Sequence, residues 1–220
     1  MTSPTIDAPV SQPRAESFLD WFRINSRVVV IGAVVVAAAV FGVWFYNRSA
    51  VLKAENADRK LLAAKQSLTS GNIPLAQSDL KKVADQYPGT SAGAEAGLLL
   101  AQVKLEQNDS QGAVAFLREL AGKNESGPYA TPVKLLLGDA YVQAGKYAEA
   151  AAEYEKAGLL TQAPNERALI LAKIGRAQTA AGNVAKAREA WEALANQQDN
   201  PGLAAEARLR LGELLAASAK

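Results

Sequence analysis

The sequence predicts an all-α fold in which one transmembrane helix precedes an α-solenoid of about four and a half helix-turn-helix units. Three observations lead to this prediction. Residue types recur with a period of 37 positions, and the apolar residues within each period follow helical spacing. In addition, one long apolar segment near the amino end carries no charge.

The chain begins with a polar segment, residues 1–26, which predicts a short disordered tail. Its prolines lie among serine, threonine and glutamine, and such a composition cannot bury a core. Residues 27–47 predict a transmembrane helix, because no charged side chain occurs between Val28 and Tyr46. At about 1.5 Å of rise per residue, this helix spans the roughly 30 Å of a hydrocarbon layer.

The residues of this segment leave two questions open: whether it is a span or a signal peptide, and which way a span is oriented. A cleaved signal peptide is the alternative to a span, since Ala37 to Ala39 offers a small-residue cleavage site. Cleavage there would leave a mature chain with an exposed apolar start, which favours the span. Basic residues are more numerous just after the segment than before it, which favours a cytoplasmic repeat domain. Long domains translocate largely regardless of charge, so charge alone leaves the orientation open.

The period of 37 is visible in five columns of equivalent residues. Residues suited to tight turns form the first column: Gly71, Asn108, Gly145 and Gly182. Alanine forms the second: Ala76, Ala113, Ala150 and Ala187. Larger apolar residues form the next two: Leu80, Leu117, Tyr154 and Trp191, then Val83, Leu120, Ala157 and Leu194. Small residues form the fifth: Ala64, Ala101, Gly138, Gly175 and Gly212. Five columns with one period indicate an internal repeat.

Each repeat predicts two helices joined by a tight turn. The turn column holds residues that tolerate a positive φ or cap a helix. Prolines mark the other boundary, where a helix cannot continue: Pro88, Pro128, Pro132, Pro164 and Pro201. The expected units are 57–93, 94–130, 131–167 and 168–204, within a repeat domain of residues 48–220. A last helix at 205–217 is expected to cover the apolar face of the fourth unit.

One unit resembles the tetratricopeptide repeat in the spacing of these seven residues: Leu137, Gly138, Tyr141, Gly145, Ala150, Tyr154 and Ala157. The resemblance implies a stack of helix pairs, an α-solenoid. The family's usual period is 34, and the spacing from the small column to the second-helix column is unchanged here. The three additional residues are therefore expected in the connections between units.

Composition excludes several kinds of site. The chain contains no cysteine and no histidine, which excludes disulfides, the usual zinc sites and thiol or imidazole catalysis. A net charge of +2 with interspersed signs predicts no nucleic-acid partner. Carboxylates such as Glu149, Glu153 and Glu155 lie near Lys156 and indicate a solvated helix face. The sequence thus predicts no enzyme, no metal, no cofactor and no small-molecule substrate.

The tetratricopeptide resemblance also implies a groove lined by one face of each first helix. Carried onto this chain, it gives these groove residues: Leu61, Leu68, Leu98, Gln102, Leu105, Leu135, Asp139, Val142 and Arg176. The face is largely apolar and its charges nearly cancel, which suits an apolar or amphipathic partner segment, either helical or unfolded. Neighbouring helices would instead bury these leucines if the stack is tilted, and the sequence alone does not decide between the two.

Shorter matches resemble the ancillary subunit of the bacterial Sec translocon, a membrane-anchored tetratricopeptide family. They are Trp21, Phe22, Arg23 and Asn25 before the span, and Gly42, Trp44 and Tyr46 at its end. A third match lies in the fourth unit: Gly175, Ala177, Gly182, Ala187, Arg188, Ala190, Trp191, Glu192 and Ala193. Ser26 stands where that family has glycine.

The Sec resemblance implies a single-pass protein of the bacterial inner membrane, with a cytoplasmic amino terminus and a periplasmic repeat domain. It implies two partners, the Sec translocon and a membrane-anchored periplasmic chaperone of the peptidyl-prolyl isomerase type. The alternative is a scaffold of another envelope machine, for outer-membrane assembly, cell-wall synthesis or cytochrome maturation.

Overall fold

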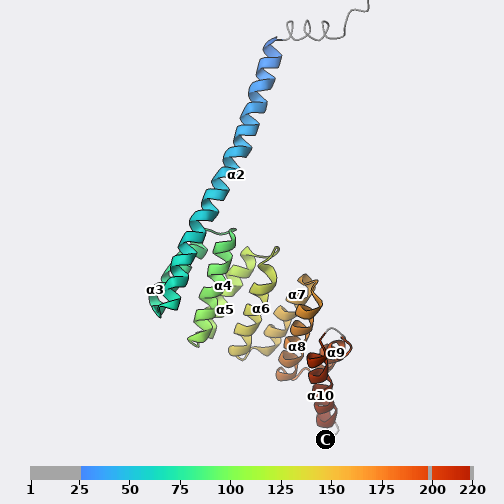
Figure 1. The fold of residues 1–220 in the computed structure, drawn as a ribbon. Helices are drawn as coiled ribbons and strands as arrows, with labels where there is room; N and C mark the ends of the chain where they lie inside the picture. Colours follow the sequence, from blue (N-terminus) through green and yellow to red (C-terminus); the bar gives the residue numbers. More distant parts are fainter. Residues whose placement is uncertain (1–25, 198–199, 219–220) are drawn as a thin grey trace, which may run out of the picture. The chain divides into compact units, whose positions relative to one another are not determined.

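The computed structural model describes residues 26–197 and 200–218, and its regular elements in these ranges are all helices. They are α2 (Ser26–Thr69), α3 (Ile73–Gln86), α4 (Ser91–Glu106), α5 (Ser110–Lys123), α6 (Ala130–Gln143), α7 (Tyr147–Leu160), α8 (Pro164–Ala180), α9 (Val184–Ala195) and α10 (Pro201–Ser218). Figure 1 shows these helices in chain order. The chain divides into two compact units, with the division between Leu52 and Lys53. The tail predicted for residues 1–26 lies outside the described residues, apart from Ser26.

Helix α2 contributes to both units. Its amino-terminal part is long and apolar enough to span a membrane, and most of the large apolar side chains there are exposed, for example Val34 and Phe41 at 62% each. Buried side chains begin only at Ala57 and continue with Leu61 and Ala64. The end of α2 is therefore the first helix of the first repeat.

The second unit, from Lys53 to Lys220, confirms the predicted solenoid of helix pairs. Each first helix (the end of α2, then α4, α6 and α8) is followed by a second helix (α3, α5, α7 and α9) that packs beside it or beside the next first helix. Apolar side chains from consecutive helices form three core clusters along the stack. In this way each repeat buries its apolar face against its neighbours.

The turns within the repeats confirm the predicted period. The backbone φ is 76° at Gly71, 60° at Asn108, 73° at Gly145 and 76° at Gly182. In the third repeat the Gly145 amide donates to the Val142 carbonyl at 3.0 Å, and the next amide closes back on the end of α6. Positive φ costs glycine nothing and asparagine little, which explains why the column contains only these two residue types.

The connections between repeats are held by caps and prolines. The Thr90 hydroxyl accepts a hydrogen bond from the Gly93 amide at 3.1 Å and so caps α4. Pro164 and Pro201 occupy the first positions of α8 and α10, where a missing amide hydrogen leaves no bond unmade. Helix α10 begins at Pro201, earlier than the predicted residue 205, because proline fits the first helical turn and Asn200 caps it.

Packing within a repeat follows the sizes of two columns. In the first two repeats Ala64 lies in the same core cluster as Leu80, and Ala101 in the same cluster as Leu117. In the next two repeats a glycine meets an aromatic ring instead. A Cβ added at Gly138 would lie 2.3 Å from the ring of Tyr154, and one at Gly175 would lie 2.5 Å from that of Trp191.

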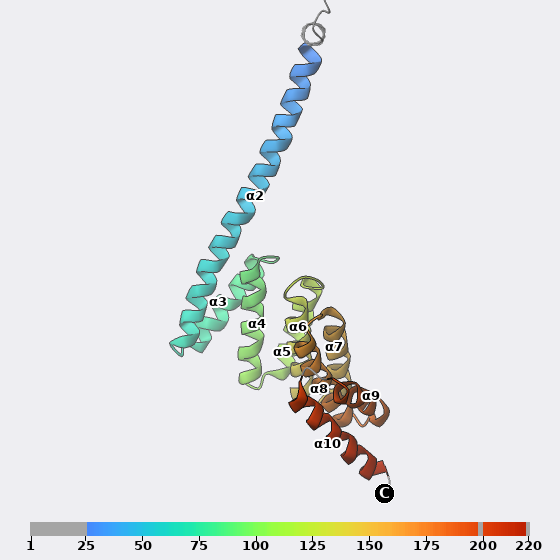
Figure 2. The same ribbon diagram turned by 45° about the vertical axis from the view of Figure 1, so that its right-hand side comes forward.

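Helix α10 closes the described end of the stack (Figure 2). It packs against α9 and α8, and its Ala207 is fully buried in one cluster with Trp191 and Leu194. The half unit therefore covers the apolar face of the fourth repeat, as the sequence predicts.

Candidate partner-binding groove

The predicted groove residues differ widely in exposure. Leu61 is only 5% exposed and belongs to the core of the first repeat. Four further leucines are half-buried and pack against the core clusters while keeping part of their surface in solvent: Leu68, Leu98, Leu105 and Leu135. Gln102, Val142 and Arg176 are exposed, and Asp139 is half-buried. The face is thus a mixture of core and surface positions.

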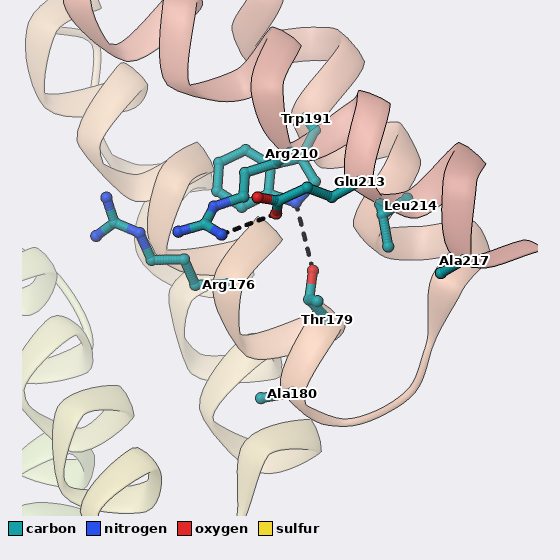
Figure 3. Close-up of a pocket in the computed structure, with 8 residues that line it drawn as sticks. All are labelled: Arg176, Thr179, Ala180, Trp191, Arg210, Glu213, Leu214 and Ala217. Carbon is teal, nitrogen blue, oxygen red and sulfur yellow. Dashed lines mark hydrogen bonds and ion pairs between the residues drawn. The ribbon is translucent and has the colours of Figure 1, made fainter.

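Two adjoining cavities bring three of these residues together. The α6–α8 cavity has a volume of about 320 Å³ and is lined by Asp139, Val142, Tyr147, Tyr154, Lys173, Arg176, Ala177 and Ala180. The α8–α10 cavity has a volume of about 420 Å³ and is lined by Arg176, Thr179, Ala180, Trp191, Arg210, Glu213, Leu214 and Ala217 (Figure 3). Arg176 and Ala180 belong to both, so the cavities form one path along α8. The predicted leucines of the first three repeats lie outside this path.

Aromatic rings reach these cavities because glycine lets them approach the first helices. Tyr154 and Trp191 are almost fully buried, yet each presents one polar atom. The Tyr154 hydroxyl donates to Asp139 Oδ1 at 2.6 Å. Trp191 Nε1 donates to Thr179 Oγ1 at 3.4 Å (Figure 3). A buried ring with a hydrogen-bonded polar edge is typical of recognition surfaces.

The electrostatics of the α6–α8 cavity depend on Asp139. Its Oδ1 atom accepts hydrogen bonds from the Tyr154 hydroxyl and from Lys173 Nζ. Burial raises the pKa of Tyr154 well above its usual value, and the hydrogen bond to the Asp139 carboxylate and the charge of that carboxylate raise it further. The hydroxyl therefore stays a hydrogen-bond donor at any physiological pH.

The cations of the α8–α10 cavity are paired within the chain. Arg176 Nη2 donates to both carboxylate oxygens of Glu206 at 2.8 Å, and Arg210 Nη1 donates to Glu213 Oε2 at 2.8 Å. Since each positive charge has a nearby carboxylate, the walls are close to neutral. Such a surface favours an apolar or amphipathic segment over a highly charged one.

Polar contacts also join each first helix to the next, and we call them the inter-unit braces. Lys65 pairs with Glu95 between α2 and α4. Gln143 Nε2 donates to the Leu105 carbonyl at 3.0 Å between α6 and α4. The remaining braces are Lys173 with Asp139, between α8 and α6, and Arg176 with Glu206, between α8 and α10. All lie at least partly in solvent.

Sequence reasoning missed several residues of the cavities. The period places Tyr154 and Trp191 in a column of larger apolar residues, with no binding role, and it does not single out Lys173 or Arg210. The repeat gives no signal for Lys173, because one period of 37 residues after Asp139 leads to Arg176 and not to Lys173. No cluster of three or more potential metal ligands occurs among the described residues.

A family model for the tetratricopeptide repeat-like domain matches the sequence at residues 20–137 and again at 59–177. The chain belongs to this family. Its members' fold generally serves as a non-catalytic scaffold for protein–protein interactions. No curated protein matches the sequence significantly.

Solved structures share the fold at low sequence identity. A kinesin light chain repeat protein of Podosopora anserina is 18% identical with a TM-score of 0.59, over 76% of this chain and 88% of that one. The pilF protein of Pseudomonas aeruginosa is 22% identical with a TM-score of 0.56, over 76% and 70%. BtubC from P. vanneervenii is 16% identical with a TM-score of 0.57, over 78% and 82%. These similarities establish the fold.

Proposed function

We propose that this protein is a membrane-anchored, non-catalytic interaction module that holds an apolar or amphipathic segment of a partner protein. The observation that carries the proposal is the path formed by the α6–α8 and α8–α10 cavities. Its walls combine Val142 and Leu214 with the polar edges of Tyr154 and Trp191. Apolar walls with a few fixed polar groups suit a segment that must be oriented as well as bound.

The finer assignment is an ancillary subunit of the Sec translocon, single-pass in the bacterial inner membrane with a periplasmic repeat domain. The sequence resemblance around the span and in the fourth repeat supports it. The family match starting at residue 20 also supports it, because that match includes the apolar segment as well as the repeats. In this role the cavities receive a membrane-anchored periplasmic chaperone of the peptidyl-prolyl isomerase type or an emerging unfolded chain.

A photo-crosslinking amino acid at Val142 tests the partner. Val142 lies in the α6–α8 cavity, whereas Leu62 is 68% exposed on α2 outside both cavities and serves as a matched control. In intact cells we expect the Val142 probe to trap translocon subunits, the chaperone or nascent chains, and the Leu62 probe to trap none of them. If the Val142 probe captures only components of another envelope machine, the translocon assignment is wrong and the scaffold alternative holds.

A compartment reporter tests the orientation. A phosphate-hydrolysing enzyme that is active only in the periplasm, fused after Lys220, is expected to be active in cells. The control is the same enzyme fused ahead of Met1, which should be inactive. Activity of the amino-terminal fusion alone would place the repeat domain in the cytoplasm and exclude secreted chains as partners.

A further inference from the structure

The outer face of α10 is apolar, although it closes the described end of the stack. Terminal repeats of solenoids normally present a polar outer face, because no further repeat covers them. Leu209 is nevertheless 63% exposed, and Ala205 and Gly212 are exposed on the same face. A Cβ built on Gly212 would meet no atom within 4 Å.

The same columns are covered in the preceding repeat. Counting back 37 residues, Ala205 corresponds to Ala168, which is fully buried, and Leu209 corresponds to Ala172, which is 1% exposed. Gly212 corresponds to Gly175, which is buried beneath the ring of Trp191. The outer face of α10 therefore repeats a surface that this fold buries against another helix.

The spacing of this face fits a helix pair. Ala205, Leu209, Gly212 and Ala216 are separated by four, three and four residues, which places them along one seam in the spacing of a coiled coil. One large side chain, Leu209, lies between two small ones. A second copy of α10 in parallel register would seat its Leu209 beside the first, over the space that Ala205 and Gly212 leave.

Charge selects the parallel arrangement. Arg208 and Glu213 flank the seam on opposite sides, and both are exposed. Within the chain, Arg208 Nη2 donates to the Ala195 carbonyl and Glu213 Oε2 accepts from Arg210 Nη1, so a contact between copies would add to these bonds or replace them. In a parallel two-fold pair, positions five residues apart on opposite flanks meet across the seam, so Arg208 of each copy would face Glu213 of the other. An antiparallel pair would instead bring Glu213 of one copy near Glu206 of the other, which is unfavourable.

We propose that α10 is a homodimer contact in which two copies of this chain pair their outer faces in parallel about a two-fold axis. A single short helix pair buries less than the roughly 1,600 Å² of a standard interface, so the contact is weak between dissolved molecules. Two copies anchored in one membrane meet at a higher effective concentration, which makes the same contact effective there. An amphipathic helix of a different protein is the competing occupant.

Introduced cysteines read the register directly, because the chain contains none of its own. The full chain is reconstituted in lipid vesicles and treated with a mild oxidant. Leu209→Cys should form a disulfide-linked dimer, since seam positions of parallel helices approach within disulfide reach. A mixture of Ala205→Cys and Ala216→Cys chains should form no mixed dimer, because those positions would lie about 16 Å apart along the axis. Ala148→Cys, exposed on α7, is the matched control.

Each result is decisive. A mixed Ala205→Cys and Ala216→Cys dimer would overturn the parallel register, and equal dimer yields from Leu209→Cys and Ala148→Cys would overturn the contact itself. In native membranes, Leu209→Cys joined by a bifunctional thiol crosslinker to a different protein, and not to itself, would assign the face to that partner.

Charge exchange separates the interface from the fold. On the Leu209→Cys background, Arg208→Glu should lower the dimer yield about tenfold, because two attractive pairs become repulsive. Adding Glu213→Arg should restore the yield, although within the chain it cannot restore the bond from Arg208 to the Ala195 carbonyl and also removes the ion pair of Glu213 with Arg210. A double variant as poor as the single one would show that Arg208 acts only within its own copy.

Discussion

The first two repeats and the next two pack their first helix against their second helix with different residues. In the first pair an alanine on the first helix lies beside a leucine from the second helix: Ala64 with Leu80, and Ala101 with Leu117. In the second pair a glycine lies beside an aromatic ring: Gly138 with Tyr154, and Gly175 with Trp191. The summed size is kept, because a close-packed interior leaves no room for a large residue in both columns.

The exchange of sizes has a chemical consequence. A leucine side chain fills space and offers no polar atom. In contrast, Tyr154 donates a hydrogen bond to Asp139, and Trp191 donates one to Thr179; both acceptors face the groove. Both described groove cavities lie over the glycine–aromatic repeats. In the third and fourth repeats, a glycine in the small column therefore accompanies an aromatic ring whose polar edge reaches a groove position.

The largest expected effect on stability comes from truncating the large side chain of a repeat, which compares an aromatic repeat with a leucine repeat. Trp191→Ala should lower the free energy of unfolding by about 4 kcal/mol, because it leaves a large cavity beneath α10. Leu117→Ala, equally buried in a leucine repeat, should cost about 3 kcal/mol. Denaturant titration followed by far-ultraviolet circular dichroism measures both. A smaller loss for Trp191→Ala than for Leu117→Ala would contradict the view that the ring is the main filling of its repeat.

Substitution of the small residue that faces the large one should have an intermediate effect on the free energy of unfolding. Gly175→Ala is expected to cost about 2 kcal/mol, because the new methyl group lies 2.5 Å from the Trp191 ring. Gly175→Ala combined with Trp191→Leu recreates the alanine–leucine pair and should recover most of that loss. Gly212→Ala is the control, since it meets no atom within 4 Å and gains up to about 1 kcal/mol of helix propensity. Additive losses in the double variant would refute the rule of summed size.

Removal of one hydroxyl tests the polar edge of the third repeat. Tyr154→Phe should cost about 1.5 kcal/mol at neutral pH, because it loses a bond to a carboxylate. The raised pKa of Tyr154 keeps the folded hydroxyl protonated, while the unfolded chain ionises near pH 10. The unfolded state then binds fewer protons, so stability falls as pH rises above 10. Unfolding titrations at pH 8 and 11 should show a smaller decline for Tyr154→Phe than for the unmodified chain, and an equal decline would contradict the shift.

Substitutions in the turns should have the smallest effect on stability. This effect should be equal in the first two repeats and the last two. Gly71→Ala and Gly145→Ala each place a side chain at a φ above 70° and should cost about 1 kcal/mol. Asn108→Ala should cost less, because asparagine already bears a side chain at positive φ. Melting temperatures of the three variants measure this order. A loss confined to one half would show that the repeats are not equivalent at their turns.

Most of the fold could be predicted because it depends on local rules repeated along the chain. The turn column indicates positive φ, and all four of its residues adopt it. The small column indicates close helix contact, which Gly138 and Gly175 confirm. Helix ends were less predictable: α10 starts at Pro201, since proline and the Asn200 cap extend the helix beyond its apolar pattern.

The binding surface could be predicted only in part, because exposure depends on how successive helices tilt. The resemblance to the tetratricopeptide family selects both Leu61 and Arg176, because each lies on the groove-facing side of a first helix. Leu61 is nevertheless in the core, whereas Arg176 lines both cavities. No spacing rule separates these cases, since the covering side chains come from other repeats. The contact between Tyr154 and Asp139 needed the three-dimensional approach of α7 to α6. As binding residues, the nine groove positions stay a prediction.

The inter-unit braces give the domain a mechanical property. Three of the four braces are ion pairs at least partly in solvent, such as Lys65 with Glu95, and pairs of this kind contribute only about 0–1 kcal/mol and weaken as salt screens them. The apolar clusters, in contrast, resist separation. These clusters also cross the junctions between repeats, so they hold the solenoid together at any ionic strength. The ion pairs add a part of the junction energy that salt weakens, and the curvature of the solenoid should therefore shift slightly between dilute and saline buffer.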